Sequence, residues 1–137
     1  MSLRAALDAV ALKQSKPATG YRLTIPDVPP SLNKVLRMHW AKKGKLRDSW
    51  TMMIKGALLP HRTPQGAQKA KMRVIVTFHN ARTYDRDNAF GACKVIFDVL
   101  RRLNLIFDDR PEWLDAEVRQ EVSTRKDKHT VIEVNPA

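Results

Sequence analysis

The residue types best suited to chemistry lie in one short stretch, Thr83-Tyr84-Asp85-Arg86-Asp87-Asn88. Side chains two apart in a strand share a face, so as a strand end this stretch would aim Asp85 and Asp87 at one point. Two close carboxylates repel each other, and a hard divalent cation relieves that repulsion. The pair therefore predicts a magnesium site suited to hydrolysis. The alternative is a plain turn in which the acids end a strand and cap a helix.

A second acidic pair, Asp108-Asp109, follows about twenty residues later and precedes Pro111. In a β-α unit the chain runs back along the helix and re-enters the sheet nearby, so we expect this pair to approach the first. Lys94 lies on the polar side of the intervening helical run, from which it can lean toward the same acids. The alternatives are an acidic turn before a proline and an ordinary solvated lysine.

Hydrophobic periodicity predicts the elements that position these residues. Alternating segments indicate strands at about 21–26, 71–79, 113–123 and 130–134, the last two joined by a charged hairpin around Lys126-Asp127-Lys128. Helical spacing indicates amphipathic helices over 46–58, ended by Pro60, and over about 89–102, ended by Asn104 as a left-handed C-cap. The proline-containing segment 27–34 should be a loop. Cys93 falls on an apolar stripe and is interpreted as a core residue.

These elements predict an α+β fold with a small mixed β-sheet packed against two main helices. The 137 residues are enough for one domain with its own core, which we assign to 21–137. Residues 1–20 are expected to form an N-terminal arm or short helix. A single cysteine, no long apolar run and no evident signal peptide favour a cytoplasmic protein without a membrane span.

Charge is unevenly distributed along the chain. Residues 1–84 hold 16 basic and 3 acidic side chains, whereas residues 85–137 hold 9 and 11. A basic first part favours a polyanion such as nucleic acid, and acids beside a phosphate ligand make sense where they bind metal. The alternative is a basic surface that only aids solubility.

Basic residues are densest between Lys34 and Arg47, where His39 and Trp40 lie among them. This pattern fits a DNA backbone, with the indole ring as a stacking surface. The alternative is a solvated loop with Trp40 folded onto the core. The residues predicted to contact DNA are Asn33, Lys34, Arg37, Lys42, Lys43, Lys45 and Arg47.

The order of these motifs resembles the RusA family of Holliday junction resolvases, especially its phage-type members. The resemblance covers about 21–134. It is carried by Pro29-Pro30-Ser31-Leu32-Asn33, Asp85-Arg86-Asp87-Asn88, Lys94, Phe97-Asp98-Val99-Leu100 and Asp108-Asp109. It implies a RusA-like domain acting as a homodimeric endodeoxyribonuclease on four-way or branched DNA in recombination and repair. It also implies Mg²⁺, with Mn²⁺ as a substitute, as cofactor and no small-molecule cofactor.

The resemblance assigns roles by position. Asp85, Asp87 and Asp109 correspond to metal-binding catalytic carboxylates, Lys94 to the essential basic residue and Asp108 to a helper. Two positions depart from the family pattern. Lys94 lies further from Asp87 than in the best-known cellular form, about 10 Å if the intervening residues are helical. Asn104 stands where glycine is common. Two other functions fit the residues: a basic nucleic-acid-binding module that cuts nothing, and a metal nuclease for simpler DNA.

Overall fold

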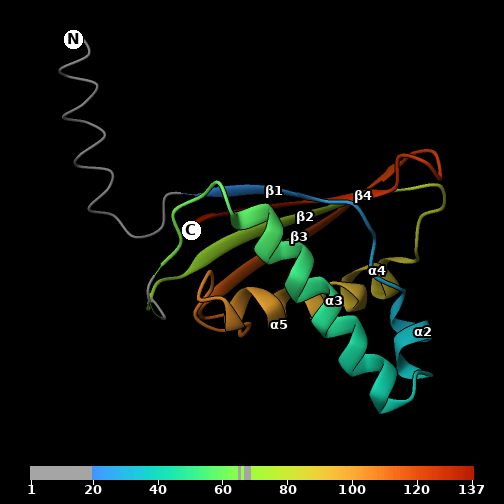
Figure 1. The fold of residues 1–137 in the computed structure, drawn as a ribbon, viewed down its shortest axis with the longest axis horizontal. Helices are drawn as coiled ribbons and strands as arrows, with labels where there is room; N and C mark the ends of the chain where they lie inside the picture. Colours follow the sequence, from blue (N-terminus) through green and yellow to red (C-terminus); the bar gives the residue numbers. More distant parts are fainter. Residues whose placement is uncertain (1–19, 65, 67–68) are drawn as a thin grey trace, which may run out of the picture.

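The computed structural model describes residues 20–64, 66 and 69–137. The arm expected at residues 1–20 therefore lies, except for Gly20, outside the described residues. No helix in the described ranges is long and apolar enough to cross a membrane. The described chain forms the α+β fold that the sequence predicts (Figure 1).

A four-stranded mixed sheet, in the order β1-β4-β2-β3, forms one layer of the molecule. β4 runs antiparallel to both of its neighbours, whereas β2 and β3 are parallel and pair from Met72↔Leu114 to Asn80↔Val122. Buried residues alternate strictly along β1 and β2, whereas β4 buries Thr130, Val131 and Ile132 in succession and the edge strand β3 buries only Leu114. The strands are β1 Tyr21–Ile25, β2 Met72–Asn80, β3 Leu114–Val122 and β4 His129–Pro136.

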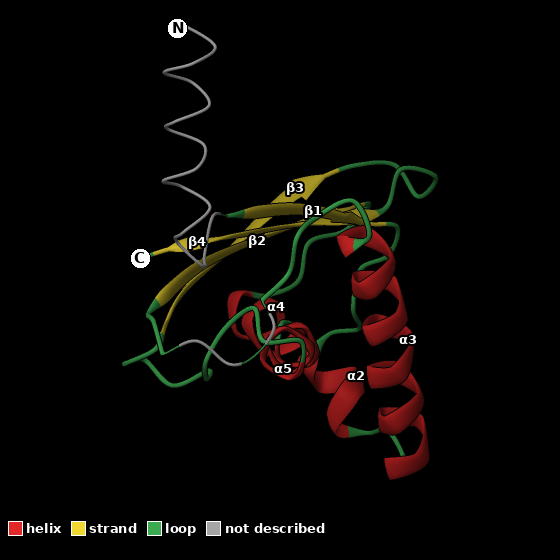
Figure 2. Ribbon diagram, turned by 60° about the vertical axis from the view of Figure 1, so that its left-hand side comes forward, coloured by secondary structure: helices red, strands yellow, loops and turns green. Residues whose placement is uncertain are grey.

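Helices cover one face of the sheet, and the other face carries none of them (Figure 2). The long α3 contributes Trp50, Ile54 and Leu58 to the core, and α5 contributes a wider apolar stripe that includes Ile96 and Leu100. The described helices are α2 Leu32–Leu36, α3 Trp40–Leu58, α4 Arg86–Ala92 and α5 Lys94–Arg102. The first helix expected from the sequence corresponds to α3, and the second corresponds to the pair α4 and α5. The helix α2 was not expected.

The predicted hairpin around Lys126-Asp127-Lys128 is wrong. β3 and β4 are not neighbours, because β2 lies between them and pairs with both. Periodicity predicts where a strand lies but not its partner, since every pairing that buries the same face satisfies the pattern.

Helix boundaries differ most from the sequence expectations. The segment expected to be a loop as far as Lys34 is already helical from Leu32, where Ser31 caps α2 by accepting a hydrogen bond from the Lys34 N–H. α3 begins at Trp40 rather than near residue 46, with the Nδ1 of His39 accepting from the N–H of Ala41. The first turns of α3 bury no side chain, so no apolar stripe marks them in the sequence.

The second predicted helix is interrupted at Cys93, which separates α4 from α5. It also starts at Arg86, earlier than expected. Cys93 is fully buried, and this burial raises the pKa of its thiol far above the ordinary value. The thiol is therefore a core group and not a nucleophile, as its position on the apolar stripe predicts.

Asn104 ends α5 in the left-handed conformation, with φ 64°. The N–H groups of Asn104 and Leu105 donate to the carbonyls of Arg101 and Leu100, over 3.1 and 2.9 Å. These two bonds are the Schellman pattern of a helix C-terminus, so the predicted cap is confirmed.

Replacing Asn104 with Ala should lower the free energy of unfolding by about 1 kcal/mol, because a Cβ disfavours positive φ and alanine lacks the local polar compensation of asparagine. Asn104→Gly should be at least as stable as the natural chain, since glycine adopts this conformation without strain. Chemical denaturation of both variants measures the difference. Equal stability of the two would show that residue 104 does not keep positive φ in solution.

Candidate functional site

The turn between β2 and α4 is held in place by two distant segments. The N–H of Tyr84 donates to Oε1 of Gln120 over 2.7 Å, and Nε2 of Gln120 donates back to the carbonyl of Tyr84 over 2.9 Å. The phenol of Tyr84 donates to the carbonyl of Pro29 over 2.8 Å. The backbone that leads into Asp85 is therefore tied both to β3 and to the loop before α2.

Asp85 and Asp87 lie at the start of α4, so the expectation that they extend a strand is wrong. Asp85 is the N-cap residue, with φ −57° and ψ 153°, and Asp87 lies in the first helical turn. The Asp85 side chain nevertheless makes no capping hydrogen bond. Within the described ranges, neither carboxylate is joined to another residue by a hydrogen bond or an ion pair. Both acids are exposed and their oxygens are free to bind a ligand.

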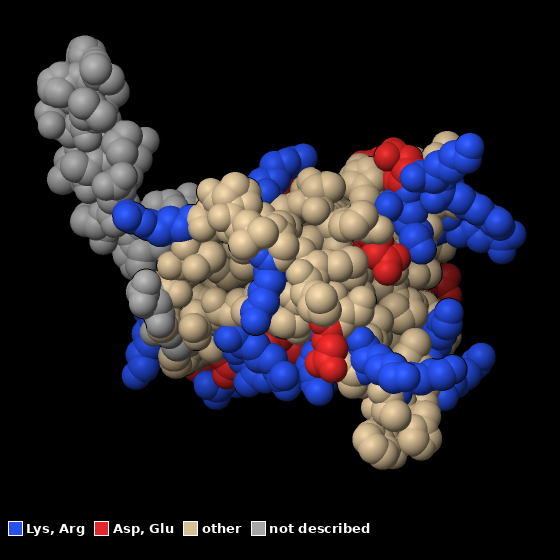
Figure 3. All heavy atoms as spheres, in the orientation of Figure 1, with Lys and Arg blue, Asp and Glu red and all other residues tan. Residues whose placement is uncertain are grey.

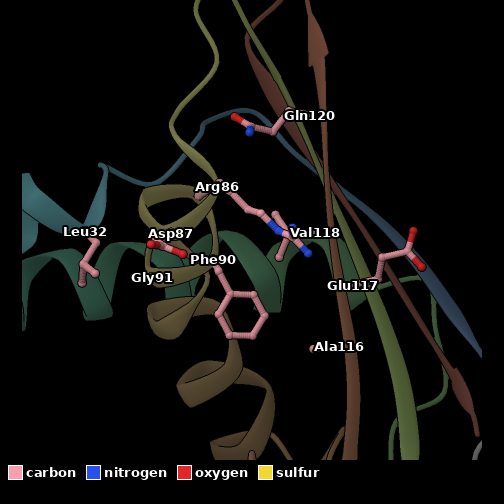
Figure 4. Close-up of a pocket in the computed structure, with 10 residues that line it drawn as sticks. Leu32, Arg86, Asp87, Phe90, Gly91, Ala116, Glu117, Val118 and Gln120 are labelled. Carbon is pink, nitrogen blue, oxygen red and sulfur yellow. The ribbon is translucent and has the colours of Figure 1, made fainter.

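A hollow of about 610 Å³ lies between α4 and the inner face of β3. Arg86 and Phe90 extend from α4 toward β3, and Asp87 lies at the opposite rim, on the α2 side (Figure 4). Part of the floor is apolar, because the half-buried side chains of Ala116 and Val118 of the edge strand line it. The hollow thus combines a carboxylate, a guanidinium and an aromatic ring on one open surface.

Lys94 and Asp109 line a second hollow, of about 530 Å³. The two hollows share lining residues from α2, α4 and β3, so they form one groove along the edge strand. We call it the α4–β3 groove. The shared residues are Leu32, Phe90, Gly91 and Ala116. Asp87 lies toward one end of the groove, and Lys94 with Asp109 lies toward the other.

The sites predicted from the sequence are therefore brought together only in part. Asp87, Lys94 and Asp109 line a common groove, whereas Asp85 and Asp108 line neither hollow. β2 and β3 are parallel, so the turn after β2 and the loop before β3 are at opposite ends of the strand pair. The chain returns to the sheet along α4 and α5, and the second acidic pair enters the groove away from the first.

Both carboxylate oxygens of Asp108 accept hydrogen bonds from the next two residues of its own loop. Its Oδ1 accepts from the N–H of Asp109 over 2.7 Å and its Oδ2 from Nε of Arg110 over 2.8 Å. The backbone bond from Asp109, followed by the bond and charge of Arg110, lowers the pKa of this carboxyl. Asp108 thus orders the loop that presents Asp109, and both of its carboxylate oxygens are engaged there.

The donor set fits magnesium chemically, although no three-ligand cluster is assembled. In the part of the chain that the structure describes, no three His, Cys, Asp or Glu side chains are close enough to hold a metal ion together. Magnesium commonly takes one or two protein carboxylates and completes its shell with water and phosphate oxygens. Asp85 and Asp87, unpaired and two residues apart, provide that smaller set.

The residues predicted to contact DNA gather on α2 and the first half of α3, which we call the α2–α3 hairpin. It projects away from the sheet, and Lys and Arg cluster over it (Figure 3). Arg47 is half-buried with an Nε that has no partner among the described residues. The other members of the set, all exposed, are Asn33, Lys34, Arg37, Lys42, Lys43 and Lys45.

The α2–α3 hairpin is fastened directly to α4. The N–H of Asn33 donates to Oδ1 of Asn88, over 3.0 Å, one residue after Asp87. Leu32 packs so closely on Gly91 that a Cβ at residue 91 would lie 2.6 Å from the Cβ of Leu32. The basic surface and the acidic turn are therefore held as one unit.

A scan of protein-family models finds no model that matches this chain, and a search of curated proteins finds no match.

Gln120, Asn88 and Phe90 are site residues that the sequence interpretation missed. The sequence contained a signal for Gln120, because it is the one polar residue in the alternating series Leu114, Ala116, Val118, Gln120, Val122. A polar side chain on an otherwise apolar strand face needs a hydrogen-bond partner. That partner, the backbone of Tyr84, is apparent only in the fold.

Gln120→Ala should lower the free energy of unfolding by about 1 to 2 kcal/mol, because the half-buried N–H and carbonyl of Tyr84 lose their partner. Glutamate at this position keeps the acceptor but loses the donor, so Gln120→Glu should be intermediate at neutral pH. Thermal unfolding of the three proteins checks this order. An unchanged melting temperature in Gln120→Ala would show that the turn does not depend on β3.

Proposed function

We propose that this protein is a metal-dependent endodeoxyribonuclease that resolves four-way or branched DNA junctions by phosphodiester hydrolysis. The observation that carries the proposal is the pair of free carboxylates at the start of α4, joined through Asn88 to the basic α2–α3 hairpin. The motif order that resembles the RusA family supports the same reaction. Unpaired carboxylates beside a surface that binds a polyanion repel its phosphates, and a bound cation removes this repulsion.

Asp85 and Asp87 are the residues that would hold a Mg²⁺ ion, whereas Asp109 lies toward the other end of the α4–β3 groove. When bound, the metal supplies an activated water and neutralises charge on the phosphate and on the leaving 3′ oxygen. Lys94 places an ammonium in the groove beside Asp109, where it can pair with a phosphate oxygen. Arg86 adds a guanidinium to the same hollow, at the rim opposite to Asp87, where it can donate to phosphate oxygens.

The α2–α3 hairpin would hold the DNA backbone. Between residues 28 and 47 the chain carries six basic residues and no acid. Lysine and arginine contacts to phosphates fix orientation without reading sequence. Because the hairpin is tied to α4, a phosphate held there is positioned relative to Asp87.

A second candidate function is a basic nucleic-acid-binding module without catalysis. The specific observation in its favour is that the described residues bring no three metal-binding side chains together. In that case Asp85 and Asp87 only begin a helix and Asp109 only occupies a turn. The basic hairpin serves both functions equally.

The deciding experiment incubates the full chain with a labelled four-way junction and with linear duplex, each in Mg²⁺ and in chelator. We expect paired nicks in the junction that depend on Mg²⁺, and little cleavage of the duplex. Cleavage of both substrates would indicate a nuclease for simpler DNA. Binding without cleavage in Mg²⁺ and in Mn²⁺ would establish the non-catalytic module.

We further propose that the protein acts as a homodimer. Two nicks in opposing strands need two acidic sites, and one copy of this domain supplies one. Light scattering at micromolar concentration should therefore give about twice the chain mass of 15.7 kDa. A monomer that still makes paired nicks would contradict this arrangement.

A further inference from the structure

The tip of the α2–α3 hairpin carries large apolar side chains that nothing covers. Trp40 is 78% exposed and Leu36 is 65% exposed. The alternative that Trp40 folds back onto the core is therefore wrong. Burying an indole removes a large apolar area from water, so an uncovered one at a projecting tip marks a contact surface.

The hairpin places this ring away from the core of the protein. Trp40 begins α3, and the first fully buried residue of this helix is Trp50, 1% exposed, after Leu46 has packed partly against the core. Six residues of α-helix place Trp40 about 9 Å beyond Leu46 along the helix axis. The imidazole of His39 lies against it, with ring centroids 5.3 Å apart. The Trp40 ring therefore contacts His39 and is otherwise exposed to solvent at the tip of the hairpin.

The positive charge near the tip indicates which kind of partner this surface can bind. Lys and Arg lie beside an uncharged end of the hairpin (Figure 3), and no acid occurs between residues 28 and 47. A second copy of this surface would meet the same positive charges, which repel. A polyanion with apolar faces suits the surface better, because phosphates can pair with the cations while a flat ring meets the indole.

We propose that Trp40 stacks on a nucleobase that has left the duplex stack. Bases in a continuous duplex have both faces covered, so a protein ring reaches them only at branch points, gaps or single strands. Stacking on Trp40 would then direct the hairpin to DNA with exposed bases, while its lysines and arginines hold the flanking backbone. The inference rests on the proposed DNA-binding function but needs no cleavage.

The test measures the affinity of the full chain in chelator for three DNAs: a four-way junction, a single strand and a continuous duplex. Trp40→Ala should weaken binding to the junction and the single strand by about 5-fold to 100-fold and leave the duplex within about 2-fold. Trp40→Phe should recover most of the loss, because it retains an aromatic face. Leu59→Ala is the matched control, since Leu59 is 84% exposed at the other end of α3.

Tryptophan emission gives an independent readout. Single-stranded DNA should quench the emission of the natural chain, and Trp40→Ala should lose that part of the quenching, while the buried Trp50 stays unaffected. Melting temperatures should match, because residue 40 contributes little to the core.

Four results would overturn the inference. These are unchanged affinities in Trp40→Ala, an equal loss on all three DNAs, a change from dimer to monomer in Trp40→Ala, and binding of anionic lipid vesicles that depends on Trp40 in place of the DNA effect. The outcome is separate from the catalytic proposal. A chain that never nicks DNA can still show the stacking effect. Conversely, if Trp40→Ala binds the junction with unchanged affinity and nicks it normally, only the stacking proposal is lost.

Discussion

Asp87→Asn is expected to reduce nicking of a four-way junction in Mg²⁺ by at least about 100-fold. The change keeps the size of the side chain but removes one negative charge and one metal-binding oxygen from the rim of the α4–β3 groove. Folding should survive within about 0.5 kcal/mol, because Asp87 is exposed and makes no ion pair with a described residue. Junction affinity in chelator should hold or increase, since a charge that repels phosphate is lost.

The matched control is Glu121→Gln, which removes the same charge from an exposed acid of β3, outside the hairpin. It should leave nicking within about 2-fold. If Asp87 only favours the start of α4, the substitution would cost about 0.3 to 1 kcal/mol of stability and leave nicking per folded molecule intact. Near-normal nicking by Asp87→Asn would therefore remove this residue from the site and, with it, most of the case for a nuclease.

Replacing Lys42, Lys43 and Lys45 by Ala is expected to flatten the dependence of DNA affinity on salt. Each phosphate contact contributes about 0.9 to the slope of log affinity against log salt, so three contacts account for up to about 2.7. The loss should be similar for different sequences, because phosphate contacts carry no sequence information. Titrations at several salt concentrations measure the slope.

A control triple removes Lys71, Arg101 and Arg102, which are exposed at the start of β2 and the end of α5, away from the hairpin (Figure 1). If the hairpin is the DNA-binding surface, this triple should change the slope much less than the hairpin triple. Equal slopes for the two triples would mean that net charge alone drives binding. An unchanged slope in the hairpin triple would place the DNA elsewhere.

The sequence by itself determined the elements that bury one face. The alternation in β1 and β2 and the stripe of Ile96, Val99 and Leu100 follow directly from contact with a core, so a pattern of apolar residues is sufficient to predict them. Asn104 was predicted as a C-cap for a similarly local reason, because few residues tolerate positive φ. The unequal charge of the two parts of the chain is likewise a property of the sequence alone.

Elements that bury nothing left no such pattern. The exposed first turns of α3 and the whole of α2 hold no fully buried side chain, and they are supported by caps at Ser31 and His39 and by the packing of Leu32 on Gly91. The break at Cys93 is also invisible, because the apolar stripe continues through it from α4 into α5. Strand partners were undetermined for a different reason, since the same buried faces allow several pairing orders.

The candidate site divides in the same way. Sequence chemistry determined which residues can act, namely the two acidic pairs, Lys94 and the basic run that carries Trp40. Only the tertiary structure decided that Asp87, Lys94 and Asp109 line one groove, that Asp108 is occupied by Arg110, and that Gln120 holds the turn from another strand. The exposure of Trp40 was also apparent only in the tertiary structure, because the residue type does not tell whether a ring faces the core or the solvent. Distances between segments far apart in the chain depend on packing, and a one-dimensional pattern does not record them.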